Sequence, residues 1–210
     1  RDQPRSRGLG DVYKRQAVDH AARILAGSTH ALEDGDLVRD FTFPMKEHGE
    51  LPPAFAADAP HSSIHVSIRD ASLPPSDAHS AQGAVEAAAA VGVQTYASSI
   101  IMCDLLVRCP SAWYKRLNEN LPVPFRVMEL GAGTGIVGMV AAHVLSCMKA
   151  EKAVVHLTDY HEDVMTNLRH NVEHRLCLPN TCVHVECMPL DWRALYDIVC
   201  PQHASGTAVA

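Results

Sequence analysis

Apolar and polar positions in the C-terminal half of the chain form short apolar runs separated by longer segments with helical spacing. Runs rich in β-branched residues predict strands, and the segments between them predict helices. The predicted strands are residues 125–130, 153–158, 182–187 and the beginning of a fourth at 196–200, and the predicted helices are 136–149 and 162–175. Strands that alternate with helices indicate right-handed βαβ units and a parallel sheet. The sequence therefore predicts an α/β fold.

The N-terminal half has a weaker pattern, in which possible helices and strands are separated by proline-rich stretches. The expected elements there are a short helix at 17–25, a strand at 64–68, a helix at 95–108 and a second amphipathic segment at 111–121. Ala97, Ile101 and Leu105 share one face of the helix at 95–108. The proline-rich residues 41–60 and the turn-rich residues 73–81 predict loops.

These patterns divide the chain into four parts. Residues 1–16 begin with Arg1 rather than Met and are basic, so we interpret them as a translated linker and leave them out of fold reasoning. Residues 17–121 form an N-terminal extension with helices and a strand. Residues 122–200 form the domain with the parallel sheet, and residues 201–210 form an unstructured tail of small residues.

Three alternating glycines follow the first strand of the predicted sheet. Gly131, Gly133 and Gly135 leave backbone N–H groups accessible and allow a ligand to approach the backbone closely. The segment from Gly133 to Gly138 also satisfies G-x-G-x-x-G, the dinucleotide fingerprint. A strand that leads directly to the first glycine favours instead the pattern E-x-G-x-G-x-G, which begins at Glu129. This pattern favours S-adenosylmethionine over a nicotinamide or flavin cofactor, and a turn without any ligand is the third interpretation.

Acidic and aromatic residues follow the other two strands. Because the carboxyl ends of parallel strands meet at one edge of a sheet, we expect these residues to lie beside the glycines. Asp159 is suited to accept hydrogen bonds from two ribose hydroxyls, or else to cap the helix at 162–175. Asp191 is suited to the exocyclic amine of adenine and Trp192 to its ring, the alternative being an ordinary loop Asp and a half-buried Trp. Glu129 is expected to order the glycines or to meet the positive amino-acid end of the cofactor.

Composition and charge exclude several other classes of function. The net charge is −6 and no basic stripe indicates nucleic acid, although an acidic enzyme attracts basic protein substrates. Seven cysteines without a C-x-x-C pair indicate reduced thiols of an intracellular protein, in the cytoplasm or the nucleus. The apolar residues 84–107 carry charges that a membrane helix would tolerate poorly. The spacing of the thirteen histidines predicts no metal site, and the absence of G-x-S-x-G disfavours a serine hydrolase.

The strings V-M-E-L-G-A-G-T-G-I-V-G, L-T-D-Y and N-L-R-H-N-V, together with L-D-W and the upstream G-V-Q-T-Y, are similar to family 16 of the seven-β-strand, class I methyltransferases. The resemblance covers residues 92–200. It implies a Rossmann-like methyltransferase fold and S-adenosylmethionine as the methyl donor. By position, Glu129, Gly131, Gly133 and Gly135 match motif one, and Asp159 matches the ribose ligand. Asp191 and Trp192 match the adenine side, and Tyr96 stands where the family usually has Trp.

The same resemblance implies a methyl acceptor. The family includes many protein-lysine methyltransferases, so a lysine amine of a protein is the first expected substrate and a small nitrogenous molecule is the second. The family's D-x-x-Y motif is absent after residue 200, so we expect a C-terminally truncated domain, with catalytic residues and oligomeric state left open. Two alternatives remain: a non-catalytic fragment that binds a cofactor or a partner, and a fragment of a dinucleotide-binding oxidoreductase.

Overall fold

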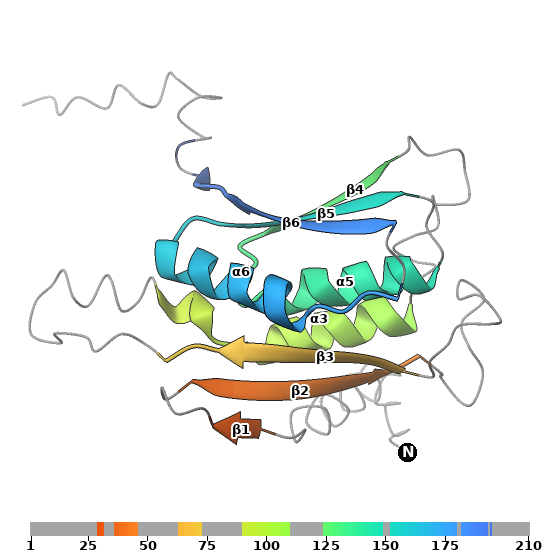
Figure 1. Ribbon diagram of the computed structural model, residues 1–210, viewed down its shortest axis with the longest axis horizontal. Coiled ribbons are helices and arrows are strands. Elements are labelled where there is room, and N and C mark those ends of the chain that lie inside the picture. Colours follow the sequence, from red (N-terminus) through yellow and green to blue (C-terminus); the bar gives the residue numbers. More distant parts are fainter. Residues whose placement is uncertain are drawn as a thin grey trace, which may run out of the picture.

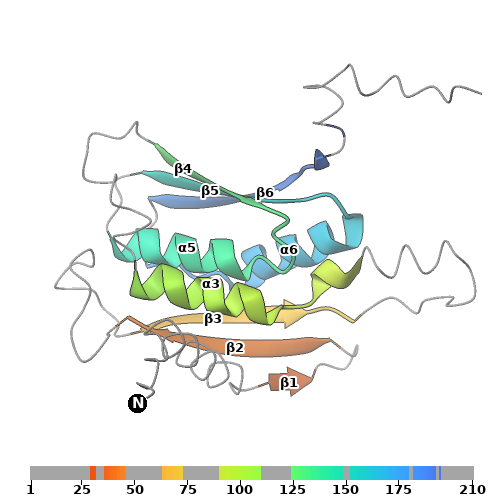
Figure 2. The same cartoon turned by 180° about the vertical axis from the view of Figure 1, so that it is seen from behind.

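Three α-helices lie between two β-sheets in the part of the chain that the structure describes (Figure 1 and Figure 2). The computed structural model describes residues 29–31, 36–45, 63–72, 90–109, 124–148, 152–179, 182–192 and 194. A parallel sheet forms one outer layer, an antiparallel sheet forms the other, and the helices fill the layer between them. The predicted α/β class is confirmed, and the parallel sheet with its helices is of the Rossmann-like kind.

The parallel sheet contains three strands in the order in which they occur in the chain. They are β4 (Phe125–Leu130), β5 (Ala153–Asp159) and β6 (Val183–Pro189), with β5 in the centre. In the strand register Leu130 pairs with Thr158, and Asp159 pairs with Pro189. The three strands therefore end at one edge of the sheet, as the sequence predicts for parallel neighbours.

Two helices connect these strands on the same face of the sheet (Figure 2). They are α5 (Ile136–Cys147), between β4 and β5, and α6 (Glu162–Arg175), between β5 and β6. The helix predicted at 136–149 ends two residues earlier in the structure, whereas the helix predicted at 162–175 has the correct bounds. Because α5 contacts both sheets, it is buried nearly all round its axis, as its almost unbroken apolar sequence requires.

The antiparallel sheet precedes these elements in the chain. It consists of β1 (Thr29–Ala31), β2 (Leu37–Pro44) and β3 (Ser63–Asp70), paired in that order. The expected strand at 64–68 is confirmed and is one to two residues longer at each end. The loop expected at 41–60 is wrong for residues 41–44, which complete β2. Alternation of Phe41 and Phe43 with polar neighbours buries both rings, and Pro44 is tolerated because it ends the strand.

A short 3₁₀ helix, η1 (Ala90–Val93), leads to the third α-helix, α3 (Ala97–Arg108). The helix expected at 95–108 is confirmed, but the face formed by Ala97, Ile101 and Leu105 is not the one that packs. The buried side consists of Ile100, Cys103, Asp104, Leu106 and Val107. The buried side is decided by contacts of α3 with α5 and β2, which spacing within one helix does not specify.

One apolar core joins the two sheets through the helices. It extends from Phe43 and Ile68 of the antiparallel sheet, through Val107 and Leu145 of the helices, to Leu157 of β5. Four further expectations fall outside the described residues: the helix at 17–25, the linker at 73–81, the segment at 111–121 and the strand at 196–200. No helix within the described ranges is both long enough and apolar enough to cross a membrane.

Candidate functional site

The turn between β4 and α5, residues 131–135, is called the glycine loop below. All three of its glycines have positive φ angles, +67° at Gly131, +57° at Gly133 and +85° at Gly135. The loop is held to the neighbouring strand, because the N–H of Ala132 donates to the carbonyl oxygen of Thr158 over 2.8 Å. It therefore forms a fixed, side-chain-poor surface at the carboxyl edge of the sheet, where ligands of open α/β sheets bind.

At Gly133 and Gly138 the neighbouring atoms leave no space for a larger residue. A Cβ atom at Gly133 would lie 3.0 Å from the carbonyl oxygen of Gly92, where η1 passes against the loop. A Cβ atom at Gly138, in the first turn of α5, would lie 2.0 Å from Cδ2 of Leu157 and 2.7 Å from Oε2 of Glu129. Gly138 thus allows α5 to approach the sheet closely.

Asp159, the last residue of β5, is hydrogen-bonded to the glycine loop. Its Oδ2 accepts from the N–H of Gly133 over 3.1 Å, and its Oδ1 accepts from the N–H of Tyr160 over 2.8 Å. The alternative role as helix cap is wrong, because the N-cap of α6 is His161, which makes no side-chain capping bond. The carboxylate therefore lies beside the loop, and its Oδ1 also accepts a longer bond, of 3.4 Å, from the N–H of His161.

Glu129 lies beneath the start of α5. Its Oε2 accepts a hydrogen bond from the N–H of Gly138 over 2.9 Å. Burial raises the pKa of Glu129 to about 7, the bond from Gly138 opposes this rise, and the neighbouring Asp159 carboxylate adds to it. A carboxyl group with this pKa gains a proton near neutrality unless a cation comes close to it.

The segment after β6 reaches the same edge of the sheet. The N–H of Leu190 donates to the carbonyl oxygen of Asp159 over 2.8 Å, which places Asp191 and Trp192 next to the end of β5. The indole of Trp192 covers Gly131, because a Cβ atom there would lie 3.5 Å from Cζ2 of the ring. Trp192 remains 55% exposed, so the residue is accessible to a ligand.

Tyr96 comes from a different element, next to a residue that contacts the glycine loop. It is the N-cap of α3 and follows Thr95, whose hydroxyl lies 3.1 Å from the hydroxyl of Thr134 in the glycine loop. Its side chain is 49% exposed. The eight residues singled out in the sequence therefore converge on one edge of the parallel sheet, from β4, the glycine loop, β5, the segment after β6 and the start of α3.

Comparison with known proteins identifies the family. The model of methyltransferase family 16, described as lysine methyltransferase, matches residues 81–207, more than half of the chain. The chain belongs to this family. A relative in Dictyostelium discoideum, an uncharacterized protein, is 34% identical over 83 residues, which are 40% of this chain and 19% of the relative. The chain thus spans about a fifth of the length of that relative. The antiparallel sheet precedes the region matched by the family model.

Two residues of the site were not singled out from the sequence. Tyr160 directly follows Asp159 and is 51% exposed, with its ring edge-on to His161. An aromatic residue immediately after a strand-end carboxylate was the available signal. Thr134 lies between two loop glycines and is buried. Its contacts come from parts of the chain whose sequence spacing carries no signal.

Three of the described histidines, His65, His170 and His174, have local partners. His170 and His174 of α6 pack with ring centroids 4.7 Å apart, and His65 lies between Thr42 and Ser63 on the antiparallel sheet. His61 lies outside the described residues. In the ranges that the structure describes, no group of three or more His, Cys, Asp or Glu side chains is arranged to hold a metal ion.

Proposed function

We propose that the chain binds S-adenosylmethionine at the glycine loop and transfers its methyl group to an amine, first of all a lysine side chain of a protein. The observation that carries the proposal is the hydrogen bond between Gly133 and Asp159. It joins the glycine loop to a strand-end carboxylate, so that groups able to contact an amino acid, a ribose and an adenine meet in one place.

The donor set fits this cofactor. Asp159 is suited to the ribose hydroxyls, because an ionised carboxylate accepts two hydrogen bonds. Trp192 and Asp191 would contact the adenine, the one by ring packing and the other by accepting from its amine. Glu129 is the carboxyl group for the cationic amino-acid end, because a nearby positive charge favours its ionised form.

The register of the loop supports this cofactor over a dinucleotide. β4 ends at Leu130, so Gly131 is the first residue after the strand. The dinucleotide fingerprint that starts at Gly133 would require two more residues between strand and first glycine than that pattern normally has. The pattern that begins at Glu129 needs no such insertion.

The bound cofactor supplies a methyl group on a positively charged sulfur. In the transfer, the lone pair of a neutral amine nitrogen forms the new N–C bond, the S–C bond breaks towards sulfur, and the nitrogen later releases a proton. The residues described here hold the donor in a fixed orientation, which makes positioning the main source of rate. Lysine is favoured as acceptor by the family description and by the net charge of −6, which attracts basic proteins.

The test is a calorimetric titration with S-adenosylhomocysteine, run beside one with NAD. We expect binding of the first compound alone. Trp192→Ala should weaken binding by about 1–3 kcal/mol, as expected for the loss of one aromatic surface against a base. Because Trp192 is half exposed, we expect the variant to remain folded, and far-UV circular dichroism checks this.

A second measurement identifies the acceptor. The chain is incubated with S-adenosylmethionine and a set of basic peptides, and lysine methylation is followed by mass spectrometry. Binding without transfer would support the non-catalytic alternative, and preferential binding of NAD would support the oxidoreductase alternative. If Trp192→Ala bound S-adenosylhomocysteine with unchanged affinity, the adenine would not bind against Trp192.

A further inference from the structure

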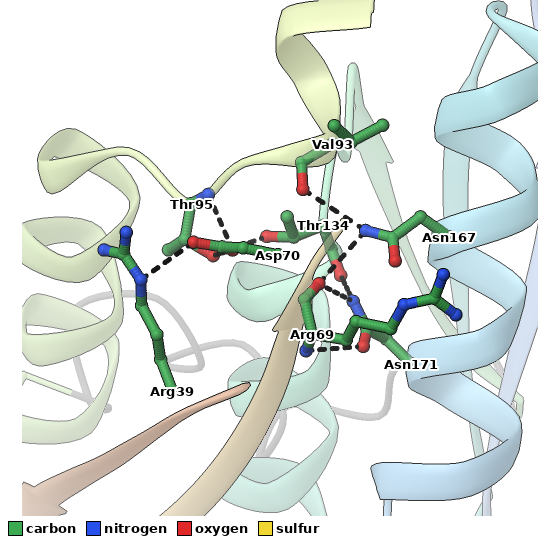
Figure 3. Close-up of polar contacts among 8 residues, drawn as sticks. All are labelled: Arg39, Arg69, Asp70, Val93, Thr95, Thr134, Asn167 and Asn171. Atoms are coloured by element: carbon green, nitrogen blue, oxygen red, sulfur yellow. Dashed lines mark hydrogen bonds and ion pairs between the residues drawn. The ribbon is translucent and has the colours of Figure 1, made fainter. Parts of the chain in front are cut away.

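A buried carboxylate at the end of the antiparallel sheet connects that sheet to α3 (Figure 3). Asp70, the last residue of β3, is only 2% exposed. Its Oδ2 pairs with Nε of Arg39 over 2.8 Å. Its Oδ1 accepts from both the N–H and the hydroxyl of Thr95, over 2.9 and 2.6 Å. Charged and buried hydrogen bonds of this kind are stronger than neutral ones, so Asp70 fixes the position of Thr95.

Thr95 in turn holds the glycine loop. A threonine hydroxyl has one proton, and that of Thr95 is donated to Asp70. The 3.1 Å contact between the two threonine hydroxyls therefore has Thr134 as donor and Thr95 as acceptor. Thr134 lies between Gly133 and Gly135, which both have positive φ angles. The chain of hydrogen bonds from the antiparallel sheet thus ends at the centre of the loop.

A second set of bonds holds Thr134 from the opposite side (Figure 3). Nδ2 of Asn171 in α6 donates to the carbonyl oxygen of Thr134 over 3.0 Å. The side-chain amide of Asn171 also contacts the backbone of Arg69 in β3. Its Oδ1 accepts from the N–H of Arg69 over 2.8 Å, and its Nδ2 donates to the carbonyl oxygen of Arg69 over 3.1 Å. Nδ2 of Asn167, one helical turn earlier, donates hydrogen bonds to the carbonyl oxygens of Arg69 and Val93. The end of β3 is therefore fastened to both the loop and the helix that follows β5.

We propose that the antiparallel sheet positions the glycine loop for its ligand, with Asp70, through Thr95, and Asn171 as positioning residues. Glycine segments lose much conformational entropy when they become ordered. Anchoring Thr134 orders the loop before the ligand arrives, and a preorganised site binds more tightly. This inference rests on the proposed function for its effect on cofactor affinity. It extends the site to a sheet that precedes the residues matched by the family model.

Asp36, the residue before β2, provides a matched control. It is buried, and its carboxylate pairs with Nε of Arg69 over 2.7 Å and accepts from the N–H of Ser72 over 2.6 Å. Asp36 and Asp70 thus each hold one arginine and one backbone N–H, but only Asp70 is bonded to Thr95. Asp36 contacts the guanidinium of Arg69, whereas the bonds from Asn171 go to the backbone of Arg69. Replacing either carboxylate removes a buried ion pair of the sheet, and replacing Asp70 also frees Thr95.

The experiment compares Asp70→Ala with Asp36→Ala, and Thr95→Val with Thr95→Ser. Two quantities are measured: the Kd for S-adenosylhomocysteine, and hydrogen–deuterium exchange of a peptide that contains residues 131–135 in the ligand-free protein. We expect Asp70→Ala and Thr95→Val to raise the Kd about tenfold and to speed exchange in the loop. Asp36→Ala and Thr95→Ser, which keep the chain of bonds intact, should stay within about threefold of the parent protein.

The outcomes separate the two proposals. If the parent protein does not bind S-adenosylhomocysteine, the proposed function fails, and loop exchange alone then decides the positioning. Equal effects of Asp36→Ala and Asp70→Ala would overturn the inference in favour of general stability of the sheet. Unchanged exchange in Thr95→Val would also overturn it. Should Asp70→Ala fail to fold, the Thr95 pair gives the answer, because valine and serine each retain most of the threonine shape.

Discussion

At the scale of single residues, Glu129 combines two roles that conflict. Its carboxylate accepts the N–H of Gly138 and so joins β4 to α5. Burial, with a contribution from Asp159, nevertheless raises the pKa of Glu129 to about 7 from its ordinary value of 4.5. An acid whose pKa is raised on folding binds more protons in the folded state, so it stabilises the fold at low pH and loses that contribution as the pH rises.

The contribution of Glu129 should be fully present below pH 4.5 and be lost as the pH rises through about 7. We therefore expect the ligand-free protein to lose on the order of 1–3 kcal/mol of unfolding free energy from this group between those pH values. Glu129→Gln keeps an acceptor for Gly138 and removes the titration. Urea unfolding at pH 5 and pH 8 measures the effect. The same change with pH in the parent and the variant would contradict the assignment.

Residues at the ends of the parallel strands could be expected beside the glycines, and the residues that connect the antiparallel sheet to the loop could not. The position of Asp159 beside the glycines follows from the register of parallel strands, which brings strand ends together. Its interpretation as a helix cap failed because the cap position falls two residues later, at His161. The link from Asp70 to Thr134 joins side chains without characteristic spacing, and only the folded structure shows it.

At the scale of elements, α5 packs against both sheets, and one missing side chain allows its approach to β5. A Cβ atom at Gly138 would overlap Leu157 of β5, as well as the carboxylate of Glu129. The sequence pattern places this glycine within the helix, three residues beyond Gly135. It did not identify β2 correctly, because the prolines after Phe43 masked a strand that ends at Pro44.

Gly138→Ala should lower the free energy of unfolding by about 1–3 kcal/mol, the usual cost of an overpacked interior position. At an exposed helical site the same substitution would raise it by up to about 1 kcal/mol, because alanine is the better helix former. The sign of the change therefore separates close packing from simple helix propensity. Chemical denaturation of the two proteins at one pH gives the difference, and a gain in stability would refute the contact with Leu157.

At the scale of the whole molecule, the two sheets share one apolar core through the helices. Phe43 of β2 is fully buried, as is Leu157 of β5, and α3 and α5 lie between the layers that contain them. The sequence predicted the parallel sheet with its helices, because each strand and helix has its own local pattern. The three-layer arrangement was not predictable in this way, since it depends on which faces of α3 and α5 meet which sheet.

A shared core implies that the two sheets unfold together. Phe43→Ala should destabilise the protein by about 3–5 kcal/mol, although the change lies in the antiparallel sheet. Thermal unfolding followed by far-UV circular dichroism and by exchange of peptides from β5 should show one common transition, shifted to lower temperature. Two separate transitions, with the β5 peptides unaffected by Phe43→Ala, would show that the sheets are independent.

The bonds between Arg69 and Asn171 join positions 102 residues apart, which has a consequence for synthesis on the ribosome. Chains emerge from the N-terminus, so β1 to β3 leave the ribosomal tunnel long before α6 does. Until α6 has been translated, the hydrogen bonds that Asn167 and Asn171 make to β3 and the glycine loop cannot form. We therefore expect a ligand of the glycine loop to protect the growing chain only after α6 has been translated.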